Sequence, residues 1–150
     1  MNHQCEVLVI NCMDFRLQSG VHDYLVSMGY KYKYDLISDA GSLKDLVEGN
    51  KDDAEKHLKA GAEKLINDIN VSYELHKVRK FIIIHHMDCG AYGGHDAFKN
   101  LEVEKEKQIY AMKKASDIIR RKFTYVEIQM VLARIDESGE VPEIDFEVIS

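Results

Sequence analysis

Short apolar runs alternate along the chain with stretches whose hydrophobic residues recur at helical spacing. The runs that predict strands are EVLVIN (6–11), KYDLIS (33–38) and KFIIIH (80–85). The first and third are apolar enough to be buried on both faces. Helical spacing predicts helices over 17–28, from Asp53 through 69, and over 102–122. Asp52 or Asp53 is the predicted N-cap of the second helix, and the charged stretch of the third is predicted to be a solvated face.

In the last part of the chain, apolar residues alternate with mostly polar ones. Residues 126–132 and 144–148 show this pattern on either side of a turn at 136–139, which predicts a hairpin whose last, acidic strand lies at a sheet edge. Strands that alternate with helices are typical of an α/β fold. We therefore predict a doubly wound, mainly parallel sheet with an antiparallel edge strand and helices on both faces, in a single domain over residues 1–150.

Composition and charge narrow the range of partners. The chain has 150 residues, of which 45% are hydrophobic, and its net charge of -6 contains no basic block. This argues against a nucleic acid or an anionic membrane as partner and favours a small molecule. With neither a membrane-length apolar run nor a basic leader, we expect a cytoplasmic protein. Three cysteines in a reducing compartment favour metal binding or chemistry over disulfides.

Groups able to bind a metal follow the first and third predicted strands. In sheets of this class, ligands bind beyond the carboxyl ends of the strands, and a 2-1-3 strand order would bring these two ends together. Two sulfurs and an imidazole suit zinc, and three protein ligands leave a fourth position open, as in catalytic zinc sites. The residues concerned are Cys12, Asp14 and Arg16 after the first strand, and His85, His86, Asp88 and Cys89 after the third.

These residues also permit other interpretations. Cys12 taken alone is typical of a small buried hydrophobe, and Cys5, at the opposite end of the first strand, is expected to be a buried bystander. A phosphatase loop of the Cys-x5-Arg type is disfavoured, because Arg16 follows Cys12 too early and Asp14 would repel phosphate. His86 is preferred to His85 as ligand because it has the His-x-x-Cys spacing and neighbouring strand residues face opposite sides.

Two segments resemble the motifs of one enzyme family. CMDFR (12–16) is similar to the Cys-x-Asp-Ser-Arg motif of the β-class carbonic anhydrases, and HMDCGA (86–91) is similar to their His-x-Asp-Cys-Gly-Ala segment. DAGS (39–42) is a fainter match to the family's Arg-Asn-Ala-Gly-Asn. The resemblance implies Zn²⁺ bound by Cys12, His86 and Cys89 beside an Asp14–Arg16 pair, and reversible hydration of CO₂ to bicarbonate.

In that chemistry, zinc lowers the pKa of a bound water to about 7, which yields hydroxide at neutral pH. Asp14 would accept the hydroxide's hydrogen bond, and Arg16 would clamp Asp14 so that it does not bind the zinc. A plain surface ion pair is the alternative for these two residues. Met13, Phe15, Met87 and Tyr92 are either a dry wall for CO₂ or core residues. His95 and His85 are either proton shuttles or ordinary histidines.

The sequence also departs from the family. Phe15 stands where the family has serine and Asp39 where it has arginine, and the stretch before Glu6 is too short for the helical extension that usually helps to build the dimer. Two alternatives therefore stay open: hydrolysis of a CO₂ analogue (COS or CS₂) at the same site, and a non-catalytic zinc-binding protein. The resemblance implies a homodimer, for which Tyr73, Leu75 and the tyrosines of 30–34 are interface candidates unless they cover the protein's own core.

Overall fold

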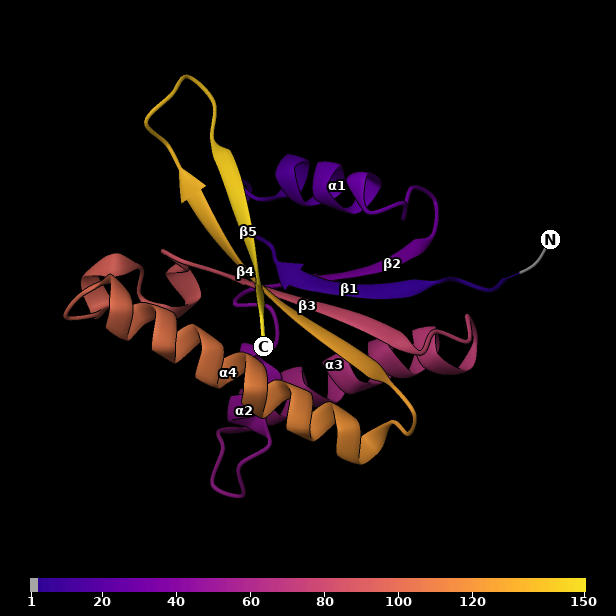
Figure 1. Ribbon diagram of the computed structural model, residues 1–150. Helices are drawn as coiled ribbons and strands as arrows, with labels where there is room; N and C mark the ends of the chain where they lie inside the picture. Colours follow the sequence, from indigo (N-terminus) through magenta and orange to yellow (C-terminus); the bar gives the residue numbers. More distant parts are fainter. Residues whose placement is uncertain (1–2) are drawn as a thin grey trace.

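The computed structural model describes residues 3–150, which form a five-stranded sheet in the order β2-β1-β3-β4-β5 (Figure 1). The strands are β1 (Val7–Cys12), β2 (Tyr34–Asp39), β3 (Lys80–His86), β4 (Glu127–Asp136) and β5 (Glu143–Ile149). The first four are mutually parallel, and β5 pairs antiparallel with β4 at the edge. The predicted fold class and the 2-1-3 order are confirmed.

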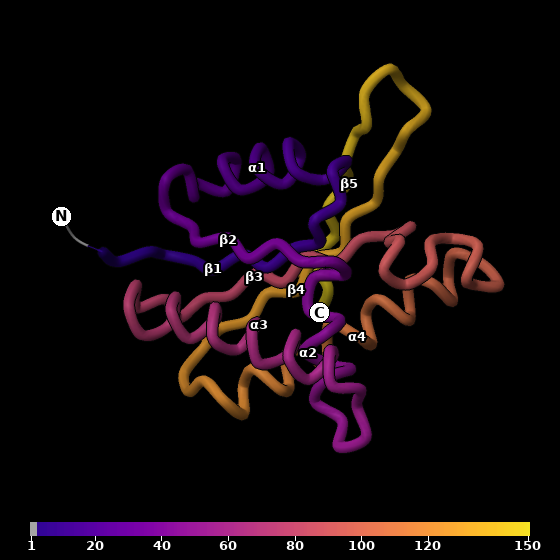
Figure 2. Tube along the Cα trace, turned by 180° about the vertical axis from the view of Figure 1, so that it is seen from behind, coloured from indigo at the N-terminus to yellow at the C-terminus, as the bar shows by residue number. Residues whose placement is uncertain are grey.

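Helices cover both faces of the sheet. Figures 1 and 2 show α1 (Gln18–Ser27) on one side, and α2 (Lys44–Gly49), α3 (Lys56–Glu74) and α4 (Leu101–Lys122) on the other. Two short 3-10 turns, Gly90–Tyr92 and His95–Ala97, lie in the loop between β3 and α4. Among residues 3–150, every helix is too short or too polar to cross a membrane.

The sheet separates two hydrophobic cores, and β3 contributes to both. Phe81 and Ile83 pack in the core with α3 and α4, whereas Ile82 and Ile84 pack in the core with α1. Alternation along a strand makes this division, because successive side chains point to opposite faces. The same alternation continues into the two histidines at the end of β3 and sends them to opposite sides of the sheet.

Two local features differ from the sequence predictions. The helix α2 was not predicted, because six residues are too few to show helical periodicity. The predicted cap of α3 by Asp52 or Asp53 is absent: Glu55 occupies the N-cap position without a side-chain hydrogen bond. Residues 51–54 instead form a turn, in which the Ala54 amide donates to the Lys51 carbonyl, so the helix begins only after it.

The predictions for the charged face of α4, for the interface candidates and for Cys5 are confirmed only in part. The charged face of α4 is solvated except at Glu104, which is fully buried. Tyr73 packs against the protein's own core: its ring is tilted against that of Phe123, and its hydroxyl donates to the Thr124 carbonyl at 3.1 Å. Tyr32 and Leu75 are exposed. Cys5 is only half-buried, and its thiol donates to the Lys33 carbonyl at 3.0 Å.

Candidate metal centre

Two adjacent parallel strands end side by side and bring the three predicted ligands together. Cys12 is the last residue of β1, His86 is the last residue of β3, and Cys89 follows in the next turn. Their ligand atoms all lie within 4.8 Å of one another, and all three residues are buried. The cluster forms on the α1 side of the sheet, where Cys12 and Cys89 pack in the hydrophobic core.

The geometry of the cluster fits a tetrahedral zinc ion. The two Sγ atoms are 3.9 Å apart, and two sulfurs bound tetrahedrally to one zinc at about 2.3 Å stand about 3.8 Å apart. His86 Nδ1 lies 2.8 Å from the Met87 carbonyl oxygen, to which its N–H can donate a hydrogen bond. His86 Nε2 is buried and has no hydrogen-bond partner among residues 3–150. A histidine that donates one ring N–H to a carbonyl presents the other nitrogen to a metal.

The two thiols lie in hydrogen-bond contact, which shifts their pKa values in opposite directions. The hydrogen bond with Cys89 holds the pKa of Cys12 well below its usual value, while the same contact and burial raise the pKa of Cys89. The contact therefore favours a thiolate at Cys12 and a protonated thiol at Cys89. The Gly41 amide also donates to Cys12 Sγ at 3.4 Å, which places the segment 39–42 beside the cluster. A dication that binds the first thiolate stabilises loss of the second proton.

Asp14 and Arg16 form a two-point clamp beside these ligands. Arg16 Nη2 lies 2.7 Å from Asp14 Oδ2, and Arg16 Nε donates to Oδ1 at 3.1 Å. Both side chains are only 14% exposed, so the alternative of a surface ion pair does not describe them. The Arg16 guanidinium also lowers the pKa of Asp14, which keeps that carboxyl ionised.

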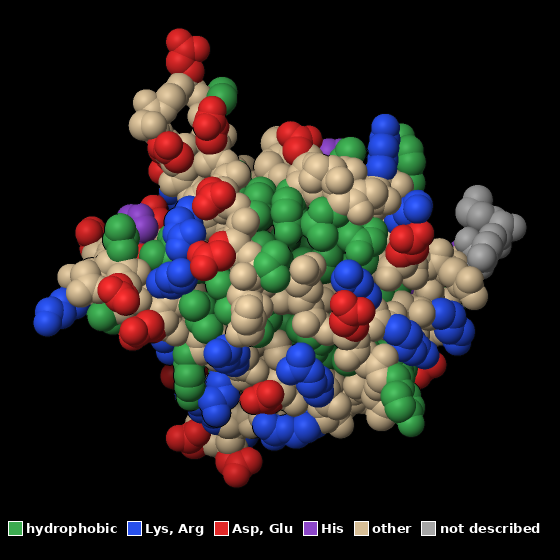
Figure 3. Space-filling model, viewed as in Figure 1, with side chains coloured by type: hydrophobic (Ala, Val, Ile, Leu, Met, Phe, Trp, Pro, Cys, Tyr) green, Lys and Arg blue, Asp and Glu red, His purple; other side chains and the backbone are tan. Residues whose placement is uncertain are grey.

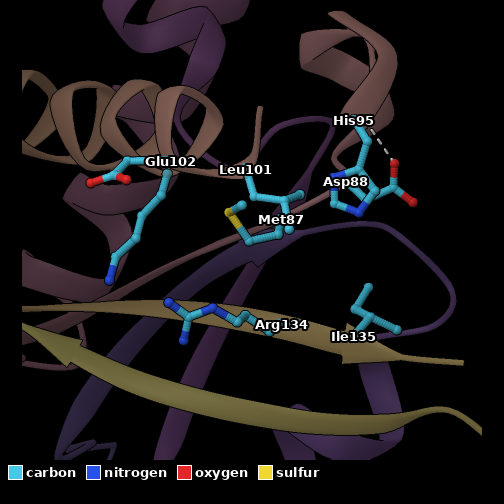
Figure 4. Close-up of a pocket in the computed structure, with 8 residues that line it drawn as sticks. Met87, Asp88, His95, Leu101, Glu102, Arg134 and Ile135 are labelled. Carbon is cyan, nitrogen blue, oxygen red and sulfur yellow. Dashed lines mark hydrogen bonds between the residues drawn. The ribbon is translucent and has the colours of Figure 1, made fainter. Parts of the chain in front are cut away.

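Asp88 ties the loop after β1 to the loop after β3. Its Oδ2 accepts from Arg16 Nη1 at 3.1 Å, and its Oδ1 accepts from the His95 backbone amide at 3.0 Å (Figure 4). The hydrogen bond from the His95 amide lowers the pKa of Asp88 most, and the hydrogen bond from Arg16 lowers it further. Arg16 Nη1 also reaches Glu137 in the β4–β5 turn at 3.0 Å. The guanidinium that clamps Asp14 is thus itself held by two further carboxylates.

Glu104, on α4, holds the loop that carries Asp88 and His95. It was not among the residues predicted from the sequence. Its side chain is 0% exposed and accepts from the Asp88 amide at 2.5 Å, while His95 Nδ1 lies 2.5 Å from its other oxygen. A signal was present in the sequence, since Glu104 precedes Gln108 and Met112 at four-residue steps along the buried stripe of α4. An acid on such a stripe needs polar partners, which here come from the β3–α4 loop.

The histidines proposed as shuttles lie in different environments. His85 is buried on the α4 side, away from the cluster, with Nδ1 2.8 Å from Gln108 Oε1, and burial lowers its pKa to about 4. That position is wrong for a proton shuttle. His95 is half-exposed, and its contact with Glu104 raises its pKa.

The four apolar residues given as either a dry wall or core lie in different environments. Met13 and Phe15 are 62% and 86% exposed, whereas Met87 is buried in the core with α3 and α4. A side chain that follows a strand end can turn outward, and no periodicity indicates which way it turns. Tyr92 is half-buried and packs against the core that contains both cysteines.

A cavity of about 450 Å³ lies next to Asp88 on the α4 side of the sheet. Figure 4 shows Asp88 and His95 at one end of it, Met87 in its middle and Arg134 on β4 opposite. Its cations are already paired: Lys105 Nζ and Arg134 Nη2 contact the two oxygens of Glu147 at 3.0 and 2.7 Å. Asp88 lines this cavity and also accepts a hydrogen bond from Arg16, so it joins the cavity to the Arg16–Asp14 pair.

The fold and the buried Cys-His-Cys cluster are those of a carbonic-anhydrase-like α/β protein, and comparison with known proteins agrees. The family model described as "Putative carbonic anhydrase" matches residues 2–145. The chain belongs to this family. It is 28% identical over 146 residues to an uncharacterized protein of Rickettsia conorii, covering 95% of this chain and 73% of that protein. A Rickettsia bellii protein is 28% identical over 138 residues, covering 89% and 79%.

Solved structures show the same fold. The β-carbonic anhydrase CcaA superposes with a TM-score of 0.51 at 12% identity, covering 99% of this chain and 85% of that one. The β-carbonic anhydrase CafA of Aspergillus fumigatus gives a TM-score of 0.50 at 12% identity, covering 98% and 76%. At these identities the likeness concerns the fold alone.

Proposed function

We propose that this chain is a zinc-dependent carbonic anhydrase that reversibly hydrates CO₂ to bicarbonate. Membership of the carbonic anhydrase family supports a lyase-type enzyme in general terms. The observation that carries the specific proposal is the pairing of a three-ligand cluster with a clamped carboxylate next to it. A purely structural zinc site would need neither Asp14 nor Arg16.

Cys12, His86 and Cys89 would hold the ion through two sulfurs and the free Nε2. When bound, zinc supplies Lewis acidity that makes water a nucleophile near neutral pH. Three protein ligands leave one position for that water. The core around Cys12 and Cys89 excludes bulk solvent from the ligand side, which strengthens the electrostatic interactions there.

Asp14 would orient the nucleophile as a hydrogen-bond acceptor. Its lowered pKa makes it a poor proton store at neutral pH, so it is suited to accepting a hydrogen bond and not to carrying a proton away. Arg16 bonds to both of its oxygens, which holds the carboxylate in one orientation and competes with its binding to the metal.

Stopped-flow CO₂ hydration by zinc-loaded protein tests the proposal. Asp14→Asn keeps the size of the side chain but removes its charge, so hydration is expected to fall by about 10²-fold or more while one zinc per chain is retained. Cys89→Ser is the matched variant for the metal and is expected to lose zinc. A zinc-loaded wild type without hydration activity between pH 6 and 9 would identify a non-catalytic zinc protein instead.

A further inference from the structure

A second cavity, between α2 and α4, is lined by an excess of cationic side chains. Its volume of about 310 Å³ falls in the range of small-molecule sites, roughly 300–1,000 Å³. One carboxylate, Glu48, lines it together with five cations: Lys44, Lys51, Lys107, Lys114 and Arg121. In a chain of net charge -6 this is a local reversal of sign. Figure 3 shows Lys and Arg side chains over the lower part of the molecule, where Figure 1 places α2 and α4.

Most of these cations are not paired with a carboxylate. Lys44 pairs with Glu48 at 2.9 Å. The other four form no ion pair with any carboxylate of residues 3–150. The cavity beside Asp88 differs in this respect, because Glu147 pairs with both of its basic residues, Lys105 and Arg134. Unpaired like charges around a hollow repel one another and concentrate anions, so an anionic ligand would relieve the repulsion.

Two tyrosines supply aromatic surface in the same cavity. Tyr92 and Tyr110 both line it, and Tyr110 is 56% exposed. The Nζ atoms of Lys107 and Lys114 lie 5.8 and 5.4 Å from the centroid of the Tyr110 ring. The ring and two unpaired cations are therefore neighbours in this cavity. Nucleobases stack on exposed aromatic rings, and ammonium groups bind phosphate oxygens.

We infer that this cavity binds a phosphorylated small molecule of the nucleotide class. The phosphates contact the unpaired lysines and Arg121, and the base packs on Tyr110. The inference rests on residues outside the zinc cluster and does not depend on the proposed hydration activity.

Calorimetric titration of the full, zinc-loaded chain with ATP tests this site. We expect one saturable site per chain, and the double variant Lys107→Gln/Lys114→Gln is expected to weaken binding at least about tenfold through the loss of charged contacts. Neither lysine has an ion-pair partner in residues 3–150, so the variant should fold, which thermal melting checks. Lys113→Gln on the exposed side of the same helix is the matched control and should leave binding nearly unchanged.

The aromatic part of the site has its own test. Tyr110→Leu is expected to lower the affinity for ATP about tenfold while leaving the affinity for tripolyphosphate unchanged. Wild-type protein that binds tripolyphosphate as tightly as ATP would overturn the nucleotide class. A lack of saturable ATP binding, or an effect of Lys113→Gln equal to that of the double variant, would overturn the site itself.

Discussion

At the scale of single residues, the contact between Glu104 and His95 makes a pH-dependent contribution to stability. The carboxylate raises the pKa of His95, with smaller contributions from Asp88 and Asp96. A raised pKa contributes stability that is fully present below the unfolded value of about 6.5 and is lost as pH rises through the folded value. The His95 side chain is 48% exposed, so solvent screening keeps the contribution small.

Glu104→Gln should therefore move the pKa of His95 down toward its usual value. An NMR pH titration of the imidazole measures this change directly. Glu106→Gln removes a neighbouring exposed carboxylate on the same helix and serves as the control. If His95 titrates at the same pH in Glu104→Gln as in the wild type, the contact seen here does not control its protonation.

Arg16 offers a second residue-scale prediction, which assumes the proposed hydration activity. Arg16→Lys keeps the positive charge, but a single ammonium group cannot bond both Asp14 oxygens and Asp88 at once. We expect CO₂ hydration to fall about tenfold or more with zinc content unchanged. Arg120→Lys, an exposed change on α4, is the control. Full hydration activity of Arg16→Lys would show that a positive charge at this position is enough, without the bonds to both Asp14 oxygens.

At the scale of elements, the close packing of α2 on α3 depends on Gly49. A Cβ at this position would press on the Leu58 carbonyl and the Ala62 side chain. Alanine favours helix over glycine by about 0.5–1 kcal/mol, but crowding in a packed contact costs about 1–3 kcal/mol. Gly49→Ala is therefore expected to lower the urea midpoint. Gly139→Ala, in the open β4–β5 turn, should leave the urea midpoint unchanged. A Gly49→Ala variant with a higher midpoint than the wild type would contradict this packing.

At the scale of the whole molecule, we expect a homodimer that covers the candidate metal centre. Met13 and Phe15, which flank Asp14, are 62% and 86% exposed, and large apolar side chains in such positions are typical of interfaces. Phe15→Lys should shift the mass measured by light scattering from dimer to monomer. Val71→Lys, at an exposed position on α3, is the control. A wild-type monomer with full hydration activity would refute the coupling of assembly and site.

Several features follow from the sequence by itself, because they depend on local order along the chain. The run from Phe81 to Ile84 indicates a strand buried on both faces, and the structure places it at the centre of the sheet. The spacing of His86 and Cys89, together with strand alternation, selected the histidine that lies beside the cysteines. The turn before α3 was beyond such patterns, since the acidic residues Asp52 and Asp53 suit a helix cap and a loop equally.

Only the tertiary structure decided how the groups around the cluster are held. The bond from the Asp88 amide to Glu104 joins residues 16 apart, and the bond from Arg16 to Asp88 joins residues 72 apart. No local pattern records such pairs, because they exist only once β1, β3 and α4 have packed. The same holds for Met13 and Phe15, whose exposure depends on what covers the end of β1. The cluster of Cys12, His86 and Cys89 was thus readable from residue spacing, whereas the network of charged side chains around it was determined by the fold.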